Sequence, residues 1–202
     1  MKLSDKLFYV GVNDDEKSLF EGLWPLPYGV SYNSYVVADE KVALIDTVEQ
    51  GFEDEFLGNV ADAIGDRNID YLVVNHMEPD HSSLTAYMLE RYPEMKIVAN
   101  AKTVPMLKGY YGVSEDRMLV VGEGDTLDLG VSSLRFFMTP MVHWPETMVT
   151  WYEAEGTLFS GDAFGTFGAV EESVVDQEDT FEEYRDEMIR YYSNIVGKYG
   201  TP

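Results

Sequence analysis

The sequence predicts an α+β fold, in which helices flank a system of mixed sheets. Strand-like runs alternate with helical patterns in the middle of the chain and then follow one another directly, which is typical of this class. Hydrophobic residues make up 45% of the 202 residues, and the 14 Tyr and 10 Phe add bulk for a packed core. A chain of this length is expected to form one domain.

The strands are predicted from short runs that are rich in β-branched and aromatic residues. In chain order these runs are Leu7–Val12, Ser31–Val37, Val42–Asp46, Tyr71–Asn75, Lys96–Ala99, Met118–Val121, Ser133–Met138, Met148–Tyr152 and Thr157–Ser160. Asp39 and Glu40 lie between the second and third runs and are expected to form a hairpin turn that leads into a buried strand.

Three helical patterns come before a fourth and clearer one: Phe52–Ile64, Ser83–Arg91 and Val104–Tyr110. The fourth begins where Thr180 and Glu183 form a capping box. Mostly aromatic residues then recur at helical spacing: Tyr184, Met188, Tyr191, Tyr192 and Ile195.

The chain ends with signals for another element. Gly197 and Gly200 are typical of a helix end and a turn, and Thr201–Pro202 fits the N-cap and first position of a new helix. We therefore expect the domain to be truncated at its C-terminus.

The composition excludes several classes of protein and site. The formal net charge of −23 argues against nucleic acids and anionic membranes as partners, and the bland interpretation is a solvated acidic surface. No apolar run approaches the roughly 18 to 20 residues that span a bilayer, and the N-terminus lacks a secretory signal. Because cysteine is absent, a metal could be held only by nitrogen and oxygen ligands.

The stretch "NHMEPDHSS" follows a predicted strand directly. His76, Glu78 and Asp80 are expected to alternate along extended backbone, because Pro79 keeps Glu78 out of helical geometry. His81 adds a fourth possible ligand, and Ser82 or Ser83 is expected to open the next helix. Taken singly, Asp80 could be a helix cap and each histidine a structural residue. Together, clustered carboxylates repel one another unless a cation offsets them, which favours a bound divalent ion.

Two later loops supply further candidates. His143 is the only other histidine and lies between Pro140 and Pro145, and Asp162 lies in a glycine-flanked turn after a strand. Each has an ordinary alternative: His143 could pack on Trp144, and Asp162 could be a turn residue.

In combination, "NHMEPDH", "HWPETM" and "LFSGDAFG" resemble the metallo-β-lactamase-like domain of the flavodiiron proteins, and so does the N-terminal stretch "YVGVNDDEKSLFEGLWPLPYGVSYNSYVV". Zinc hydrolases of this fold carry H-x-H-x-D-H, whereas here Glu78 replaces the middle histidine. An anionic oxygen ligand suits iron. The resemblance implies a four-layer αβ/βα sandwich over residues 1–202, incomplete at the C-terminus, without the flavodoxin-like domain that carries FMN.

The resemblance also implies a ligand set for two irons. His76, Glu78 and His143 would bind the first iron, Asp80 and His81 the second, and Asp162 would bridge the two. The position of His81 is not a direct ligand in every member. The family has one further histidine for the second iron, which this sequence lacks. Trp144, Phe164 and Tyr192 are candidates for an apolar wall that shields the site, with ordinary core packing as the alternative.

The function implied is reduction of dioxygen to water or of nitric oxide to nitrous oxide. Electrons would come from a rubredoxin-like donor through the FMN of a partner subunit, in a cytoplasmic homodimer or homotetramer. This chain alone would react once and would not turn over without outside electrons. Three alternatives stay open: a flavin-free diiron oxygen sensor, a zinc hydrolase of the same fold, and an inactive fragment that binds the second metal weakly.

Overall fold

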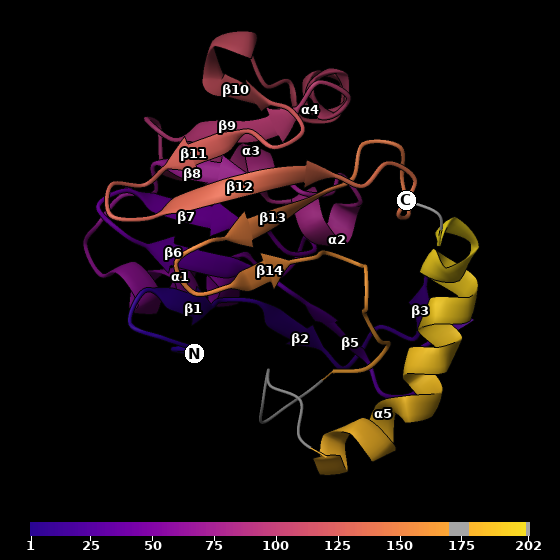
Figure 1. Ribbon diagram of the computed structural model, residues 1–202. Helices are drawn as coiled ribbons and strands as arrows, with labels where there is room; N and C mark the ends of the chain where they lie inside the picture. Colours follow the sequence, from indigo (N-terminus) through magenta and orange to yellow (C-terminus); the bar gives the residue numbers. More distant parts are fainter. Residues whose placement is uncertain (170–177, 201–202) are drawn as a thin grey trace.

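The computed structural model describes residues 1–169 and 178–200 and contains two larger sheets (Figure 1). The six-stranded sheet has the order β1 (Leu7–Tyr9), β6 (Tyr35–Ala38), β7 (Val42–Ile45), β8 (Tyr71–Val73), β9 (Lys96–Asn100) and β10 (Met118–Val121). It is parallel from β7 to β10 and antiparallel from β1 to β7. The four-stranded sheet is an antiparallel meander of β11 (Thr126–Asp128), β12 (Ser133–Met138), β13 (Met148–Tyr152) and β14 (Thr157–Phe159).

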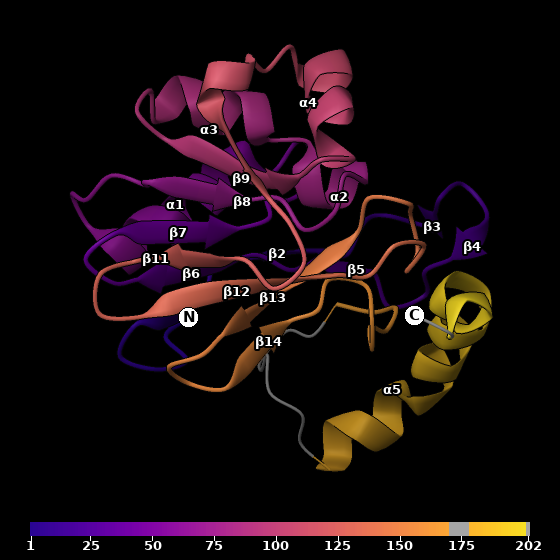
Figure 2. The same ribbon diagram turned by 45° about the horizontal axis from the view of Figure 1, so that its top comes forward.

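Helices cover one face of the six-stranded sheet, and the four-stranded sheet covers the other (Figure 2). The covering helices are α1 (Glu53–Ile64), α3 (Thr85–Arg91) and α4 (Thr103–Tyr111). Strand β7 shows why: Val42 and Leu44 join the core under the helices, whereas Ala43 and Ile45 join the core between the sheets. All four residues are buried, because a strand covered on both faces is apolar throughout rather than alternating.

Smaller elements complete the described fold. Two short pairs, β2 (Val12–Asp14) with β5 (Val30–Tyr32) and β3 (Leu19–Phe20) with β4 (Trp24–Pro25), lie towards the side where α5 (Glu178–Tyr191) runs (Figure 1). Helix α5 continues into η2 (Tyr192–Val196) and η3 (Gly197–Tyr199), and η1 (Glu115–Arg117) precedes β10. No helix among the described residues has the length and apolar character needed to cross a membrane.

Most predicted elements are confirmed, with corrections at their boundaries. The hairpin at Asp39 and Glu40 is present, since Ala38 pairs with Val42. Two predicted strands, Leu7–Val12 and Ser31–Val37, are each split into two strands that join different sheets. Helix α5 begins at Glu178, two residues before the predicted cap at Thr180. The signal at Thr201–Pro202 lies outside the described residues.

Candidate metal centre

The candidate site lies at one edge of the two sheets, where several strand ends meet. His76 and Glu78 follow β8, and His143 lies in the loop between β12 and β13. Asp162 follows β14. The structure thus brings together side chains that are up to 86 positions apart in sequence. They meet because β8, β12 and β14 all end at this edge.

The backbone of the central motif differs in part from the prediction. Glu78 is extended (φ −60°, ψ 144°), as expected for a residue before proline. Asp80, however, is not on extended backbone: Pro79 is the first residue of the single-turn helix α2 (Pro79–Ser82), which carries both Asp80 and His81. The helix thus begins before Ser82, because the fixed φ of proline suits a first helical position. The hydroxyl of Ser82 donates to the carbonyl oxygen of Met77 at 2.8 Å and closes the turn.

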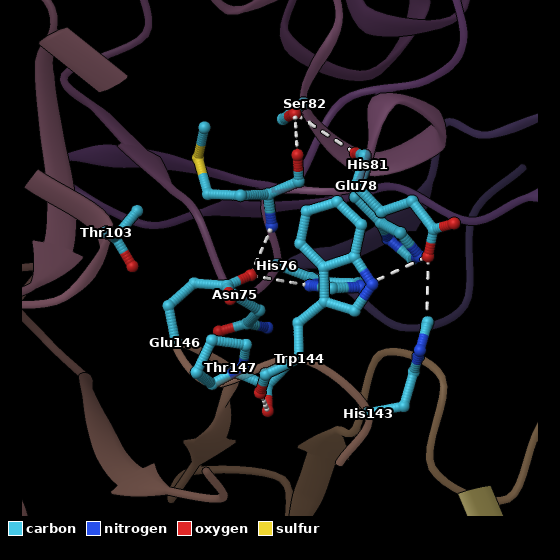
Figure 3. Close-up of polar contacts among 12 residues, drawn as sticks. Asn75, His76, Glu78, His81, Ser82, Thr103, His143, Trp144, Glu146 and Thr147 are labelled. Atoms are coloured by element: carbon cyan, nitrogen blue, oxygen red, sulfur yellow. Dashed lines mark hydrogen bonds and ion pairs between the residues drawn. The ribbon is translucent and has the colours of Figure 1, made fainter. Parts of the chain in front are cut away.

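Four side chains form the first half of the site. Ligand atoms of His76, Glu78, His143 and Asp162 all lie within 4.8 Å of one another. Glu78 Oε2 is 2.9 Å from His143 Nε2 and 3.3 Å from His76 Nε2 (Figure 3). Asp162 Oδ2 is 3.2 Å from His76 Nε2 and 3.4 Å from His143 Nε2. The two imidazoles and two carboxylates therefore point at a common centre.

Asp80 and His81 form a second half beside the first. His81 Nε2 lies 3.1 Å from Asp162 Oδ1 and 3.8 Å from Asp80 Oδ2. Asp162 thus presents Oδ2 to the first half and Oδ1 to the second, which is the arrangement that a bridging carboxylate requires. All six predicted ligands are brought into one buried cluster.

Two carboxylates behind the histidines were missed by sequence reasoning. Glu146 Oε1 accepts a hydrogen bond from His76 Nδ1 at 2.8 Å. Asp46 follows strand β7, where its Oδ1 accepts from the backbone N–H of Asn75 at 2.7 Å. Its Oδ2 lies 3.8 Å from His81 Nδ1. The available signal was Glu146 within "HWPETM" and the acid that ends the buried strand "VALID".

The predicted apolar wall needs correction at Tyr192. Trp144 packs edge-on against His76, with ring centroids 5.2 Å apart. Phe164 is 88% exposed but lines a cavity beside the site, whereas Tyr192 is 58% exposed and is not part of that lining. The adjacent Tyr191 is only 5% exposed and donates from its hydroxyl to Asp162 Oδ1 at 2.9 Å. The helical pattern included Tyr191 but could not tell which of two neighbouring tyrosines faces the site.

A cavity of about 360 Å³ opens beside the second half of the site. Asp80, His81 and Asp162 contribute to its lining. Aromatic side chains form much of the rest: Tyr9, Phe20, Tyr32, Tyr35, Phe164, Phe181, Tyr184 and Tyr191. The cavity gives a small molecule access to the carboxylates from one side.

The ionisable groups are strongly perturbed by burial and by one another. Burial lowers the pKa of His76, but hydrogen bonds with Glu146 and Glu78 outweigh it and raise the value to about 9. Burial also opposes the shift at His143, whose contacts with Asp162 and Glu78 raise its pKa to about 10. Burial raises the pKa of Glu78, but hydrogen bonds from His143 and His76 lower it to about 2. Positive charge on the histidines is therefore needed to balance the carboxylates.

The donor set fits a pair of divalent metal ions. Among the described residues, every ion pair of Glu78, Asp80 and Asp162 is with a histidine. Asp80 Oδ1 and Asp162 Oδ2 are buried without a hydrogen bond, which is costly unless a cation or proton is near. Three imidazoles and three carboxylates offer nitrogen and hard oxygen ligands on both sides of Asp162. This set of ligands suits iron.

The chain is similar to known proteins along most of its length. A family described as "ODP family beta lactamase" matches residues 30–198. The anaerobic nitric oxide reductase flavorubredoxin of Shigella dysenteriae serotype 1 (strain Sd197) is 38% identical over 199 residues, which are 96% of this chain and 41% of the relative.

Solved structures agree with that finding. Rubredoxin oxygen:oxidoreductase from Desulfovibrio gigas matches with a TM-score of 0.90 and 35% identity, covering 98% of this chain and 49% of that one. The flavodiiron protein from Giardia intestinalis matches with a TM-score of 0.89 and 30% identity, covering 96% and 47%. This chain therefore spans about half the length of the relatives that it matches.

Proposed function

Because the chain belongs to the ODP beta-lactamase family, with the metallo-β-lactamase-like fold and the flavodiiron relatives that its sequence predicted, we propose that it is the diiron domain of an oxygen or nitric oxide reductase. One observation carries the proposal: His76, Glu78 and His143 converge on one side of Asp162, and Asp80 and His81 lie on its other side. A carboxylate at position 78 favours iron over zinc.

In this proposal each predicted ligand has a place. His76, Glu78 and His143 hold the first iron, Asp80 and His81 hold the second, and Asp162 contacts both. When bound, the two ferrous ions supply one electron each to dioxygen or nitric oxide. The chain itself excludes water from one side by packing Trp144 on His76 and admits a small gas from the other through the aromatic cavity.

The relatives are about twice as long as this chain, and we propose that the remaining functions of the enzyme belong to other domains. We infer that residues 1–202 are one metallo-β-lactamase-like domain and that FMN binds to a separate flavodoxin-like domain. A rubredoxin-type electron donor, a homodimeric or homotetrameric assembly and a cytoplasmic location are parts of the same proposal. The names of the Desulfovibrio gigas and Shigella dysenteriae relatives support the donor class and both substrates.

The test is to load the chain with ferrous iron without oxygen and to count tightly bound iron per chain. We expect two irons in the unaltered chain and a clear loss in Asp162→Ala, which removes the shared carboxylate. Nitric oxide added to the iron-loaded chain should then yield nitrous oxide, and dioxygen added to it should be consumed. Zinc binding with esterase activity would support a hydrolase instead, and a stable gas adduct without product would support a sensor.

A further inference from the structure

The two halves of the site differ in how their histidines are held from behind. His76 Nδ1 donates to Glu146 Oε1 at 2.8 Å, whereas His81 Nδ1 has no hydrogen bond and lies 3.8 Å from Asp46 Oδ2. The Trp144 ring also packs against His76, with a centroid distance of 5.2 Å and an interplanar angle of 89°. The His76 ring is thus fixed on two sides, and the His81 ring is held less closely.

Glu146 is itself held firmly in place. Its Oε1 also accepts from the backbone N–H of Met77 at 3.0 Å, and its backbone carbonyl accepts from Asn100 Nδ2 at 2.5 Å. Lys102 Nζ donates to the carbonyl oxygen of Pro145 at 3.0 Å, which fixes the same loop to the start of α4. Glu146 Oε1 therefore has a defined position, set by β8 on one side and by β9 and α4 on the other.

Stability alone does not account for a carboxylate at this position. Glu146 is 1% exposed, and its second oxygen, Oε2, is buried without a hydrogen bond. An unpaired buried oxygen of this kind destabilises the fold. Its first oxygen, Oε1, instead contacts Nδ1 of His76, and the Nε2 atom of the same ring points at Glu78 and Asp162.

We propose that Glu146 is a positioning residue of the metal centre, which holds the His76 ring with Nδ1 protonated and Nε2 directed at the first metal. A neutral imidazole carries its proton on one nitrogen only, so an acceptor at Nδ1 leaves the Nε2 lone pair free for a metal. This inference rests on the metal centre of the proposed function, but not on which gas is reduced.

The centre is consequently asymmetric. The first half binds metal through a histidine that is already oriented, whereas His81 in the second half has to be oriented as the metal binds. The first metal should therefore bind more tightly than the second, and Glu146 should affect the first binding step.

The experiment uses Zn²⁺ as a redox-inactive probe in the full 202-residue chain. Zn²⁺ affinity is measured by chelator competition, and the tautomer of metal-free His76 is measured by long-range ¹H–¹⁵N correlation spectra above pH 9, where the ring is neutral. With only 3 histidines in the chain, assignment through single His→Gln variants is practical. Glu146→Ala removes the acceptor, and Glu146→Gln keeps an acceptor but removes the charge. Glu123→Ala is the matched control, because Glu123 also accepts from a backbone N–H (Met138, 2.7 Å) but lies on the surface.

We expect Glu146→Ala to weaken the first Zn²⁺ site by about 10- to 100-fold, which is typical for loss of such a partner. Its His76 ring should become a mixture of tautomers, whereas Glu146→Gln should recover most of the affinity and Glu123→Ala should change neither quantity. If Glu146→Ala does not fold, Glu146→Asp keeps the charge but withdraws the oxygen by one methylene, and it should also weaken the site.

Three results would overturn the inference. One is a neutral His76 ring that carries its proton on Nε2 and not on Nδ1 in the unaltered chain, and another is unchanged affinity in the folded Ala or Asp variant, even if the melting temperature falls. The third is absence of Zn²⁺ binding in the unaltered chain, which would also refute the metal centre. Failure of gas reduction with normal Zn²⁺ binding would affect the proposed function alone.

Discussion

At the scale of single residues, one contact of the site lies one residue away from the one expected. Tyr191 and Tyr192 are neighbours on helical spacing, but only Tyr191 faces inward, where its hydroxyl reaches Asp162. A change of one position rotates a helical side chain by about 100°, so spacing alone cannot choose between adjacent residues. Asp162 consequently has a hydrogen-bond donor from α5 in addition to its histidines.

Tyr191→Phe should therefore destabilise the chain by about 1.5–3 kcal/mol, because it removes one hydrogen bond to a charged group and leaves Asp162 with its histidines. It should also weaken metal binding slightly, since Asp162 is held less firmly. Thermal unfolding and metal titration measure the two effects. Tyr192→Phe is the control, because that hydroxyl lies on an exposed residue and its loss should change neither quantity.

The raised histidine pKa values give a second prediction. His76 and His143 titrate at about 9 and about 10 in the folded protein, above the ordinary value of 6.5. Their contribution to stability is therefore fully present below pH 6.5 and is lost as the pH rises through 9 and 10, by up to about 1.4 kcal/mol per pH unit for each proton. Metal binding needs neutral imidazoles, so metal affinity should rise over the same range.

Melting temperatures between pH 6 and pH 10 check this sign. The metal-free chain should become less stable on the alkaline side, and the chain saturated with Zn²⁺ should not. An alkaline increase in the stability of the metal-free chain would contradict the assigned charges.

At the scale of elements, the sequence predicted the strongly patterned segments well. Strands β7, β12 and β13 and helix α1 match closely, because burial on fixed faces imposes a clear period. Strands β3, β4 and β11 were missed, and β3 and β4 have only two residues each, which are too few to show a period. The six ligands were found because their residue types are rare and clustered in motifs, whereas Glu146 and Asp46 look like ordinary acids until the fold places them behind histidines.

Helix α5 is held on the site by close contacts as well as by Tyr191. Gly168 has φ +115°, and a Cβ atom there would lie 2.4 Å from the ring of Tyr184. Gly168→Ala should thus cost about 1–3 kcal/mol from backbone strain and a further 1–3 kcal/mol from the clash. Gly51→Ala is the matched control, since Gly51 has φ +102° but no atom within 4 Å of such a Cβ.

Unfolding in urea would measure both alanine variants. The Gly168 variant should lose more stability than the Gly51 variant, and it should also bind metal less well because α5 carries Tyr191. Equal losses of stability in the two variants would mean that the ring of Tyr184 on α5 does not pack against Gly168.

At the scale of the whole molecule, the charge and length of the chain bear on how it works. The net charge of −23 is distributed around a site that itself concentrates buried carboxylates, so cations are the natural ligands of this protein. The chain also spans about half the length of its relatives, and the cavity beside Asp162 is a route to the site. If FMN binds to a separate domain, as proposed, residues 1–202 can store electrons only on their metals.

The number of electrons on the metals limits how much nitrous oxide each chain can form, and this amount can be measured. Two nitric oxide molecules, two electrons and two protons give one nitrous oxide and one water, and two ferrous ions hold two electrons. The iron-loaded chain should therefore form about one nitrous oxide per chain and then stop, whereas Asp162→Ala should form little. Because NADH cannot pass hydride to a metal site without a flavin, NADH alone should not restart the reaction. Many turnovers with NADH would show that these 202 residues contain their own route for electrons, and the division of the enzyme into a diiron domain and a separate flavin domain would be wrong.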